Sequence, residues 1–240
     1  MTGGGSGIGA ATACALATAG WSVAVIGRRR EPLDAVCAAA SGDLLAHVAD
    51  VSIEASVIAA FDAVIARFGR IDLLFNNAGT MMRPTAIGAV SLDAWRALLD
   101  VNVTGAFLCA REAFRRMAAQ DPQGGRIINN GSISAHVPRP LAVGYTVSKH
   151  AITGLTRALS LEGRGSNIAC GQIDIGNAVS AMSASLAAGA MQADGAIRPE
   201  PMMDVDNVAR SVLHMASLPL DTNVQFMTVM ASAMPYIGRG

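Results

Sequence analysis

Apolar residues follow two alternating patterns along the chain. Short runs rich in Val, Ile and Leu alternate with longer segments in which apolar residues recur every three or four positions. The first pattern indicates buried strands and the second amphipathic helices. Strands are expected at 22–26, 44–48, 71–75, 126–130, 168–173 and 224–230. Helices are expected at 6–19, 31–40, 54–68, 91–119, 144–161 and 204–216.

This alternation predicts an α/β fold of the Rossmann type, a doubly wound parallel sheet with helices on both faces. The 240 residues contain no linker and no internal repeat, so we expect a single domain over 1–240. The segment 178–201 is rich in Ala, Ser, Met and Gly and follows a strand whose carboxyl end should face the ligand crevice. We expect it to be a substrate lid.

The start of the chain departs from this fold. A buried strand normally precedes the glycine-rich turn of a dinucleotide fold, but only Met1 and Thr2 precede Gly3 here. Either the natural start lies further upstream, which we favour, or the protein lacks the strand that usually lies in the middle of the sheet. The first strand is therefore expected to be missing.

Composition narrows the class of ligand. The formal net charge is zero and 15% of residues are charged, so no basic field attracts nucleic acid or an anionic membrane surface. No apolar stretch is long enough for a membrane span, and no secretory signal precedes the first motif, which favours a cytoplasmic location. The four cysteines and four histidines are scattered, so no metal site is expected. A neutral small molecule is the expected substrate.

The first candidate binding motif is the glycine-rich turn before the first predicted helix. Gly3, Gly7 and Gly9 stand where a tight turn lets a pyrophosphate approach main-chain N–H groups at a helix N-terminus, with Ser6 and Ile8 between them. A glycine-rich turn alone is a weak signal, because glycine serves many strand-to-helix turns. Other motifs must decide the function.

The strongest signal is Tyr145 followed four residues later by Lys149 on a predicted helix, with Ser132 just after a buried strand. Residues i and i+4 share one face of a helix, so the ammonium lies beside the phenol. A free tyrosine has a pKa of about 10, and a neighbouring cation favours the phenolate. The pair is therefore suited to general acid/base chemistry near neutral pH.

These motifs, in this order, resemble the short-chain dehydrogenase/reductase (SDR) family from Thr2 to about Ile173. The resemblance implies a catalytic set of Asn102, Ser132, Tyr145 and Lys149. Tyr145 and Lys149 would also contact the cofactor, Lys149 at the nicotinamide ribose. Ser132 would bind the substrate oxygen, and Asn102 would position a water in a proton relay. The resemblance further implies cofactor contacts, on the adenosine side at Asp50, Val51, Asn76, Ala78 and Gly79, and at the nicotinamide from the turn at Gly176.

The choice of cofactor depends on the end of the second predicted strand. NAD enzymes usually carry Asp or Glu there, whereas an arginine favours the 2′-phosphate of NADP. Arg28 and Arg29 follow the strand and no carboxylate precedes Glu31, so NADP(H) is preferred and NAD(H) stays open. The alternative is that these arginines form a solvated loop.

The predicted function is an oxidoreductase that transfers a hydride between NADP(H) and a carbonyl/alcohol pair on a small, largely uncharged substrate. After the sixth predicted strand the family commonly has a Pro-Gly turn, but this chain has Asp174-Ile175-Gly176 there. Asp174 would add a negative charge near the site, which leaves the substrate class open. The alternative function is a non-catalytic nucleotide-binding sensor or scaffold of the same fold. A nucleotide-sugar epimerase or dehydratase would need a longer C-terminal substrate region. The resemblance also implies a homo-oligomer, a tetramer or a dimer.

Overall fold

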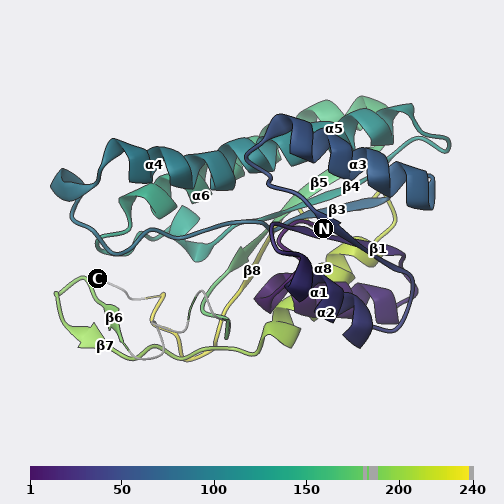
Figure 1. Ribbon diagram of the computed structural model, residues 1–240. Helices are drawn as coiled ribbons and strands as arrows, with labels where there is room; N and C mark the ends of the chain where they lie inside the picture. The colour runs from purple at the N-terminus through teal and green to yellow at the C-terminus, as the bar shows by residue number, and fades with distance from the viewer. Residues whose placement is uncertain (181–182, 184–188, 238–240) are drawn as a thin grey trace.

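The computed structural model describes residues 1–180, 183 and 189–237. Its strands are parallel, apart from a short hairpin, and helices cover both faces of the sheet (Figure 1). β1 pairs with β2, and four further strands follow in the order β3-β4-β5-β8. The strands are β1 (Val23–Gly27), β2 (Leu44–Val48), β3 (Leu73–Asn76), β4 (Gly125–Asn130), β5 (Ile168–Ile175) and β8 (Phe226–Val229). The predicted Rossmann-type α/β fold is confirmed.

The helices form two layers. One face of the sheet carries α3 (Glu54–Phe68), α4 (Leu92–Leu99), α5 (Ala106–Ala119) and α6 (Val143–Glu162), and the other carries α1 (Gly7–Thr18), α2 (Arg30–Ala39) and α8 (Val205–Ser217). Short 3-10 turns occur at η1 (Ile87–Ala89), η3 (Ile133–Ala135) and η4 (Gly163–Ser166), and β6 (Ala190–Met191) and β7 (Ile197–Arg198) form the hairpin. None of the helices in the described part of the chain is both long enough and apolar enough to cross a membrane.

Successive residues of a strand pack in two different hydrophobic cores, one on each face of the sheet. Leu74 and its partner Ile127 pack in the core under α3 and α5, whereas the next pair, Phe75 and Ile128, packs in the core under α1 and α8. Successive strand side chains point to opposite faces, so strands buried on both sides need continuous apolar runs. This explains why the strand positions were predictable from the sequence.

The helix predicted at 91–119 is not continuous, which corrects the sequence-based expectation. α4 ends at Leu99, a π turn η2 (Asp100–Gly105) follows, and α5 begins at Ala106. A π turn adds a residue to the helical repeat and shifts the side chains beyond it around the axis. The inserted turn carries Asn102, whose side chain bonds to main-chain groups of Thr80 instead of facing solvent.

Met1 and Thr2 lie where the first strand of a dinucleotide fold normally runs. The Ile26 N–H donates to the Met1 carbonyl at 2.9 Å, and the Thr2 N–H donates to the Phe75 carbonyl at 3.1 Å. These two residues therefore link β1 to β3. The Thr2 hydroxyl oxygen accepts hydrogen bonds from two further main-chain N–H groups after β3, those of residues 77 and 78, at 3.0 Å each.

The segment 178–201 lies partly outside the described residues. Within its described part, Ala178 forms a bridge with Met203, and β6 and β7 form the hairpin. Its role as a lid stays a prediction.

We expect Thr2→Val to lower the free energy of unfolding by about 1 to 3 kcal/mol, because it leaves two main-chain N–H groups without their acceptor. Urea unfolding followed by circular dichroism measures this. Thr12→Val is the matched control. Thr12 is equally buried, but its hydroxyl only donates to the Ile8 carbonyl in its own helix, so its loss should be smaller. Equal losses in the two variants would contradict the prediction.

Candidate active site

A cavity of about 260 Å³ opens at the carboxyl ends of β3, β4 and β5. Ligands of open α/β sheets bind in this crevice, beyond the strand ends. Its wall is made by the glycine turn before α1, by the segments that follow the three strands, and by the first turns of α6. The described lining residues include Gly3, Ser6, Gly7, Ile8, Gly9, Ala78, Gly79, Ser132, Tyr145, Lys149 and Gly176.

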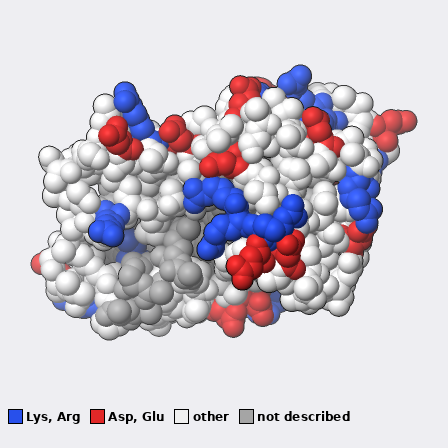
Figure 2. Space-filling view, in the orientation of Figure 1, with Lys and Arg blue, Asp and Glu red and all other residues white. Residues whose placement is uncertain are grey.

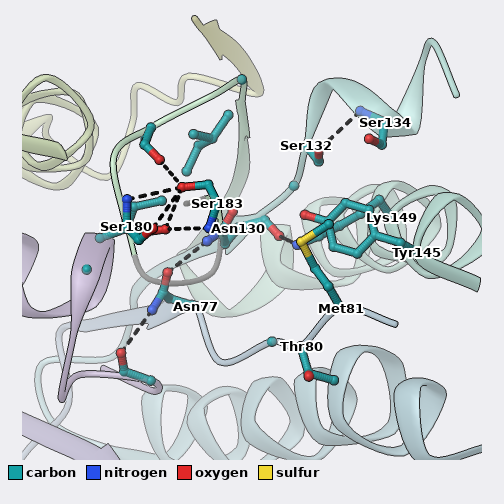
Figure 3. Close-up of a pocket in the computed structure, with 18 of the residues that line it drawn as sticks. Asn77, Thr80, Met81, Asn130, Ser132, Ser134, Tyr145, Lys149, Ser180 and Ser183 are labelled. Carbon is teal, nitrogen blue, oxygen red and sulfur yellow. Dashed lines mark hydrogen bonds between the residues drawn. The ribbon is translucent and has the colours of Figure 1, made fainter. Parts of the chain in front are cut away.

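Tyr145 and Lys149 lie side by side on α6 and face this cavity (Figure 3). The Lys149 Nζ atom is 5.5 Å from the centre of the Tyr145 ring and donates a hydrogen bond to the Asn130 carbonyl at 2.7 Å. Lys149 is buried, so its charge acts on the phenol in a medium of low dielectric. The carbonyl contact fixes the ammonium beside the tyrosine.

Ser132 reaches the same cavity from the segment that follows β4. Its hydroxyl oxygen accepts a hydrogen bond from the Ser134 N–H at 3.1 Å. A hydroxyl has one proton to donate in addition to its lone pairs. The Ser132 proton is therefore available for an oxygen atom bound in the cavity.

Asn102 lies behind the cavity wall. Its Oδ1 atom accepts from the Thr80 N–H at 2.8 Å, and its Nδ2 atom donates to the Thr80 carbonyl at 2.9 Å and to the Ser148 hydroxyl at 3.2 Å. Thr80 lines the cavity and Ser148 precedes Lys149 on α6. Asn102 thus ties the segment after β3 to the helix of Tyr145.

The glycine turn is shaped for a close ligand. Gly3 and Gly7 have φ angles of +65° and +51°, which disfavour any side chain, and a Cβ atom on Gly9 would overlap the Gly3 carbonyl oxygen. α1 begins at Gly7, and the side chain of Ser6 caps none of its N–H groups. The first N–H groups of a helix have no partner within it and carry partial positive charge. This turn therefore fits the pyrophosphate of a dinucleotide.

A second cavity of about 190 Å³ adjoins the first along the glycine turn and extends towards the ends of β1 and β2. Arg28, Arg29, Asp50 and Val51 line it. Hydrogen bonds from the Ser52 hydroxyl and N–H, at 2.7 and 2.9 Å, lower the pKa of the Asp50 carboxyl, and Arg28 adds to this shift. Asp50 is the acidic residue among the described lining of this cavity.

Arg139 brings a cation to the first cavity and is neutralised there by Glu200. Its guanidinium donates to both Glu200 carboxylate oxygens, at 2.9 and 2.6 Å, and to the Asn177 amide oxygen at 2.9 Å. Gln192 and Asn177 also donate to Glu200, at 2.9 and 2.7 Å. We call Glu200 and its three partners, Arg139, Asn177 and Gln192, the Glu200 clasp. Burial alone raises the pKa of Glu200, but these hydrogen bonds outweigh it and lower that pKa to about 2.

Comparison with known proteins shows which family the chain belongs to. The sequence model of the short chain dehydrogenase family matches residues 1–190. The chain belongs to the short-chain dehydrogenase family. D-threitol dehydrogenase of Mycolicibacterium smegmatis is 41% identical over 170 residues, which cover 69% of this chain and 64% of that protein. Human dehydrogenase/reductase SDR family member 11 is 36% identical over 169 residues, covering 68% and 65%. The chain therefore spans just under two thirds of the length of these relatives.

Solved structures agree with this assignment. 3-ketoacyl-(acyl-carrier-protein) reductase from Brucella melitensis, complexed with NADH, superimposes with a TM-score of 0.87 at 25% identity, covering 97% of this chain and 96% of that one. Levodione reductase gives a TM-score of 0.85 at 27% identity, covering 95% and 94%. The short-chain dehydrogenase fold thus extends over nearly the whole chain.

Two of the short-chain dehydrogenase positions predicted from the sequence, Asn102 and Asn76, line neither cavity. Asn76 is buried, and its amide donates to the Ala106 carbonyl at 2.8 Å and to the Asn129 side chain at 3.2 Å, so it braces β3 against α5 and β4. The next residue, Asn77, lines the first cavity instead and accepts a hydrogen bond from Asn130 at 2.7 Å. Adjacent strand residues point to opposite faces, so the strand register could have separated the two asparagines.

Other lining residues had no sequence signal that would have drawn attention to them. Asn130, Arg139 and Asn177 line the first cavity, and Glu200 joins them from a distant part of the chain. Only the folded structure brings these polar residues together. No group of three His, Cys, Asp or Glu side chains suited to a metal ion occurs in the described ranges.

The Glu200 clasp predicts a specific dependence of stability on pH. A carboxyl whose folded-state pKa lies below its usual value of 4.5 stabilises the fold above that value and loses this contribution as pH falls towards 2. We expect the melting temperature of Glu200→Gln to lie below that of the wild type at pH 7, and the difference to shrink between pH 5 and about 2.5. Thermal unfolding of both proteins at several pH values checks this, and a constant difference would contradict it.

Proposed function

We propose that this protein is a nicotinamide-dependent oxidoreductase that interconverts a carbonyl and an alcohol on a small, largely uncharged substrate, with NADP(H) as its preferred cofactor. The observation that carries the proposal is the meeting of Ser132, Tyr145 and Lys149 in one cavity beside a glycine turn suited to a pyrophosphate. Family membership adds to this support.

Each of the three side chains has a distinct role in the proposed reaction. The Tyr145 phenol gives a proton to the substrate oxygen in reduction and takes it back in oxidation. The Asn130 carbonyl holds the Lys149 ammonium beside the phenol, where its positive charge offsets the negative charge that develops on the phenol oxygen as the proton leaves. The Ser132 hydroxyl donates to the substrate oxygen, where negative charge develops. Bound cofactor supplies or accepts the hydride.

The preference for NADP(H) is supported by the arginines after β1. Among the described residues, Arg28 and Arg29 have no hydrogen-bond or ion-pair partner, although both line the second cavity. Arg30 lies outside that cavity, donates to the Ala46 carbonyl at 3.1 Å and pairs with Asp34 at 3.6 Å. Two open guanidinium groups suit the 2′-phosphate of NADP, and a hydroxyl-binding carboxylate after β1 is absent from the described lining.

The uncharged substrate is supported by the charge balance of the first cavity. Its described lining has two charged residues, Arg139 and Lys149, and Glu200 neutralises the first. Two of the similar proteins, D-threitol dehydrogenase and levodione reductase, are named for uncharged substrates. Basic and acidic side chains are also mixed over the face in Figure 2, so neither sign would steer a charged substrate.

Asn102 is proposed to serve the proton relay, since its side chain bonds to Ser148, the residue before Lys149 on α6, and to Thr80 in the cavity wall. Assembly into a homo-oligomer and a cytoplasmic location stay predictions.

Turnover of NADPH and NADH against a panel of small ketones, diketones and polyols tests the proposed function. Reduction or oxidation that depends on Tyr145 would support the enzyme. Tight NADPH binding without turnover on the whole panel would favour a nucleotide-binding sensor, and a protein that is folded but binds neither nucleotide would contradict both functions.

Tyr145→Phe is expected to lower kcat by at least about a hundredfold, because it removes the proton that general acid/base catalysis requires. The dissociation constant for NADPH should change by less than about threefold, since the ring and Lys149 remain in place. Stopped-flow kinetics and fluorescence titration measure the two quantities. Turnover by the variant close to that of the wild type would contradict the assigned role.

Arg28→Ala combined with Arg29→Ala is expected to weaken NADPH binding by about ten- to a hundredfold, because hydrogen bonds to a charged group contribute about 1.5 to 3 kcal/mol. NADH binding should hardly change. Arg30→Ala is the matched control, since it removes a neighbouring arginine that lies outside the cavity. A double variant that loses NADH and NADPH binding equally would contradict the assignment.

A further inference from the structure

A carboxylate lies directly behind Ser132. Asp174, near the end of β5, is fully buried and lines neither cavity. Burying a charge is costly unless hydrogen bonds compensate for it, so the partners of this side chain are informative. Three partners surround it, two from the segment that begins at Ser132 and one from β5 itself.

The first partner is the main chain of the catalytic serine. The Asp174 Oδ1 atom accepts a hydrogen bond from the Ser132 N–H at 3.0 Å. A Cβ atom on Gly131 would overlap this same oxygen, so the carboxylate lies directly against the main chain at that point. The segment that presents the Ser132 hydroxyl is therefore fitted around Asp174.

The second partner connects Asp174 to the helix of Tyr145 and Lys149. Gln172 donates through Nε2 to Asp174 Oδ1 at 2.7 Å and to the Thr153 hydroxyl at 3.1 Å. Its Oε1 atom accepts from the Thr156 hydroxyl at 3.0 Å. Thr153 and Thr156 both lie on α6, and Thr153 is one turn beyond Lys149. A continuous set of hydrogen bonds thus joins α6 to the Ser132 segment.

The third partner closes the other side of the carboxylate. The His136 Nε2 atom lies 2.8 Å from Asp174 Oδ2, and the histidine ring is half-exposed. His136 follows η3, the short turn that begins just after Ser132. Asp174 therefore holds the Ser132 segment at two points, its N–H group and a side chain four residues later.

We propose that Asp174 is a positioning residue, which sets the Ser132 hydroxyl against Tyr145 by fixing the main chain of Ser132 and linking it through Gln172 to α6. This inference rests on the proposed function. On this view, a buried acidic residue outside the cavity helps to fix the arrangement of the groups on which turnover depends. A displacement of about 1 Å at a reacting group can cost about a hundredfold in rate.

The test compares Asp174→Ala and Asp174→Asn, each with and without Ser132→Ala. We expect Asp174→Ala to lower kcat by about ten- to a hundredfold with the NADPH dissociation constant unchanged. Asp174→Asn should recover most of the loss, because its amide oxygen still accepts from the Ser132 N–H and its side chain keeps the volume of the carboxyl group. In the Ser132→Ala background, Asp174→Ala should cost less than about twofold more.

Glu112→Ala controls for loss of a buried carboxylate as such. Glu112 is also buried and ion-paired, but it lies on α5 among arginines and away from both cavities. Its kcat should equal that of the wild type. If Asp174→Ala does not fold, Gln172→Met, which cuts the link to α6 and leaves the Ser132 contact, replaces it under the same criteria.

Three outcomes would overturn the inference: kcat of a folded Asp174→Ala equal to that of the wild type, an effect that is undiminished in the Ser132→Ala background, or an equal loss in Glu112→Ala. With wild-type turnover intact, these outcomes leave the proposed function standing. A wild type that is inactive on the whole panel removes the proposed function, and the inference falls with it.

Discussion

The geometry of the site depends on which groups form hydrogen bonds with the main-chain N–H and carbonyl groups where the parallel strands end. Beyond the last ladder bond of a strand, N–H and carbonyl groups lose their partners, and those that remain buried need others. Side chains supply them here: Asn77 bonds to the Thr2 and Gly3 carbonyls, Asn102 to both main-chain groups of Thr80, Lys149 to the Asn130 carbonyl and Asp174 to the Ser132 N–H. Each of these bonds also fixes a wall of the cavity.

The same constraint explains what the sequence revealed and what it did not. Strands buried on both faces require continuous apolar runs, and a helix brings residues four apart together, so the sheet and the Tyr145–Lys149 pair follow from local spacing. The bonds at the strand ends join residues far apart in sequence. The alternation along β3 separates Asn76 from Asn77, but nothing local singles out Asn130 as the partner of Asn77, or Arg139 as the partner of Glu200.

The interruption of the helix at 91–119 is a second case of long-range control. The local sequence favours one continuous helix, but a π turn interrupts it. The turn places the Asn102 amide where it bonds to both the N–H and the carbonyl of Thr80. A buried amide that satisfies both main-chain groups of one residue offsets the poorer geometry of the π turn. Tertiary hydrogen bonds therefore outweigh helix propensity at this position.

The residues around Asp174 indicate that its buried carboxyl group is an integral part of the architecture. Gly131 leaves the space that the carboxylate occupies, and Gln172 and His136 supply donors that a buried acid requires. A side chain at position 131 would overlap the carboxyl oxygen of Asp174, and loss of Gln172 or His136 would remove one of its hydrogen-bond partners. The Ser132 segment is held by these hydrogen bonds, so residues that lie outside the cavity determine the position of the Ser132 hydroxyl.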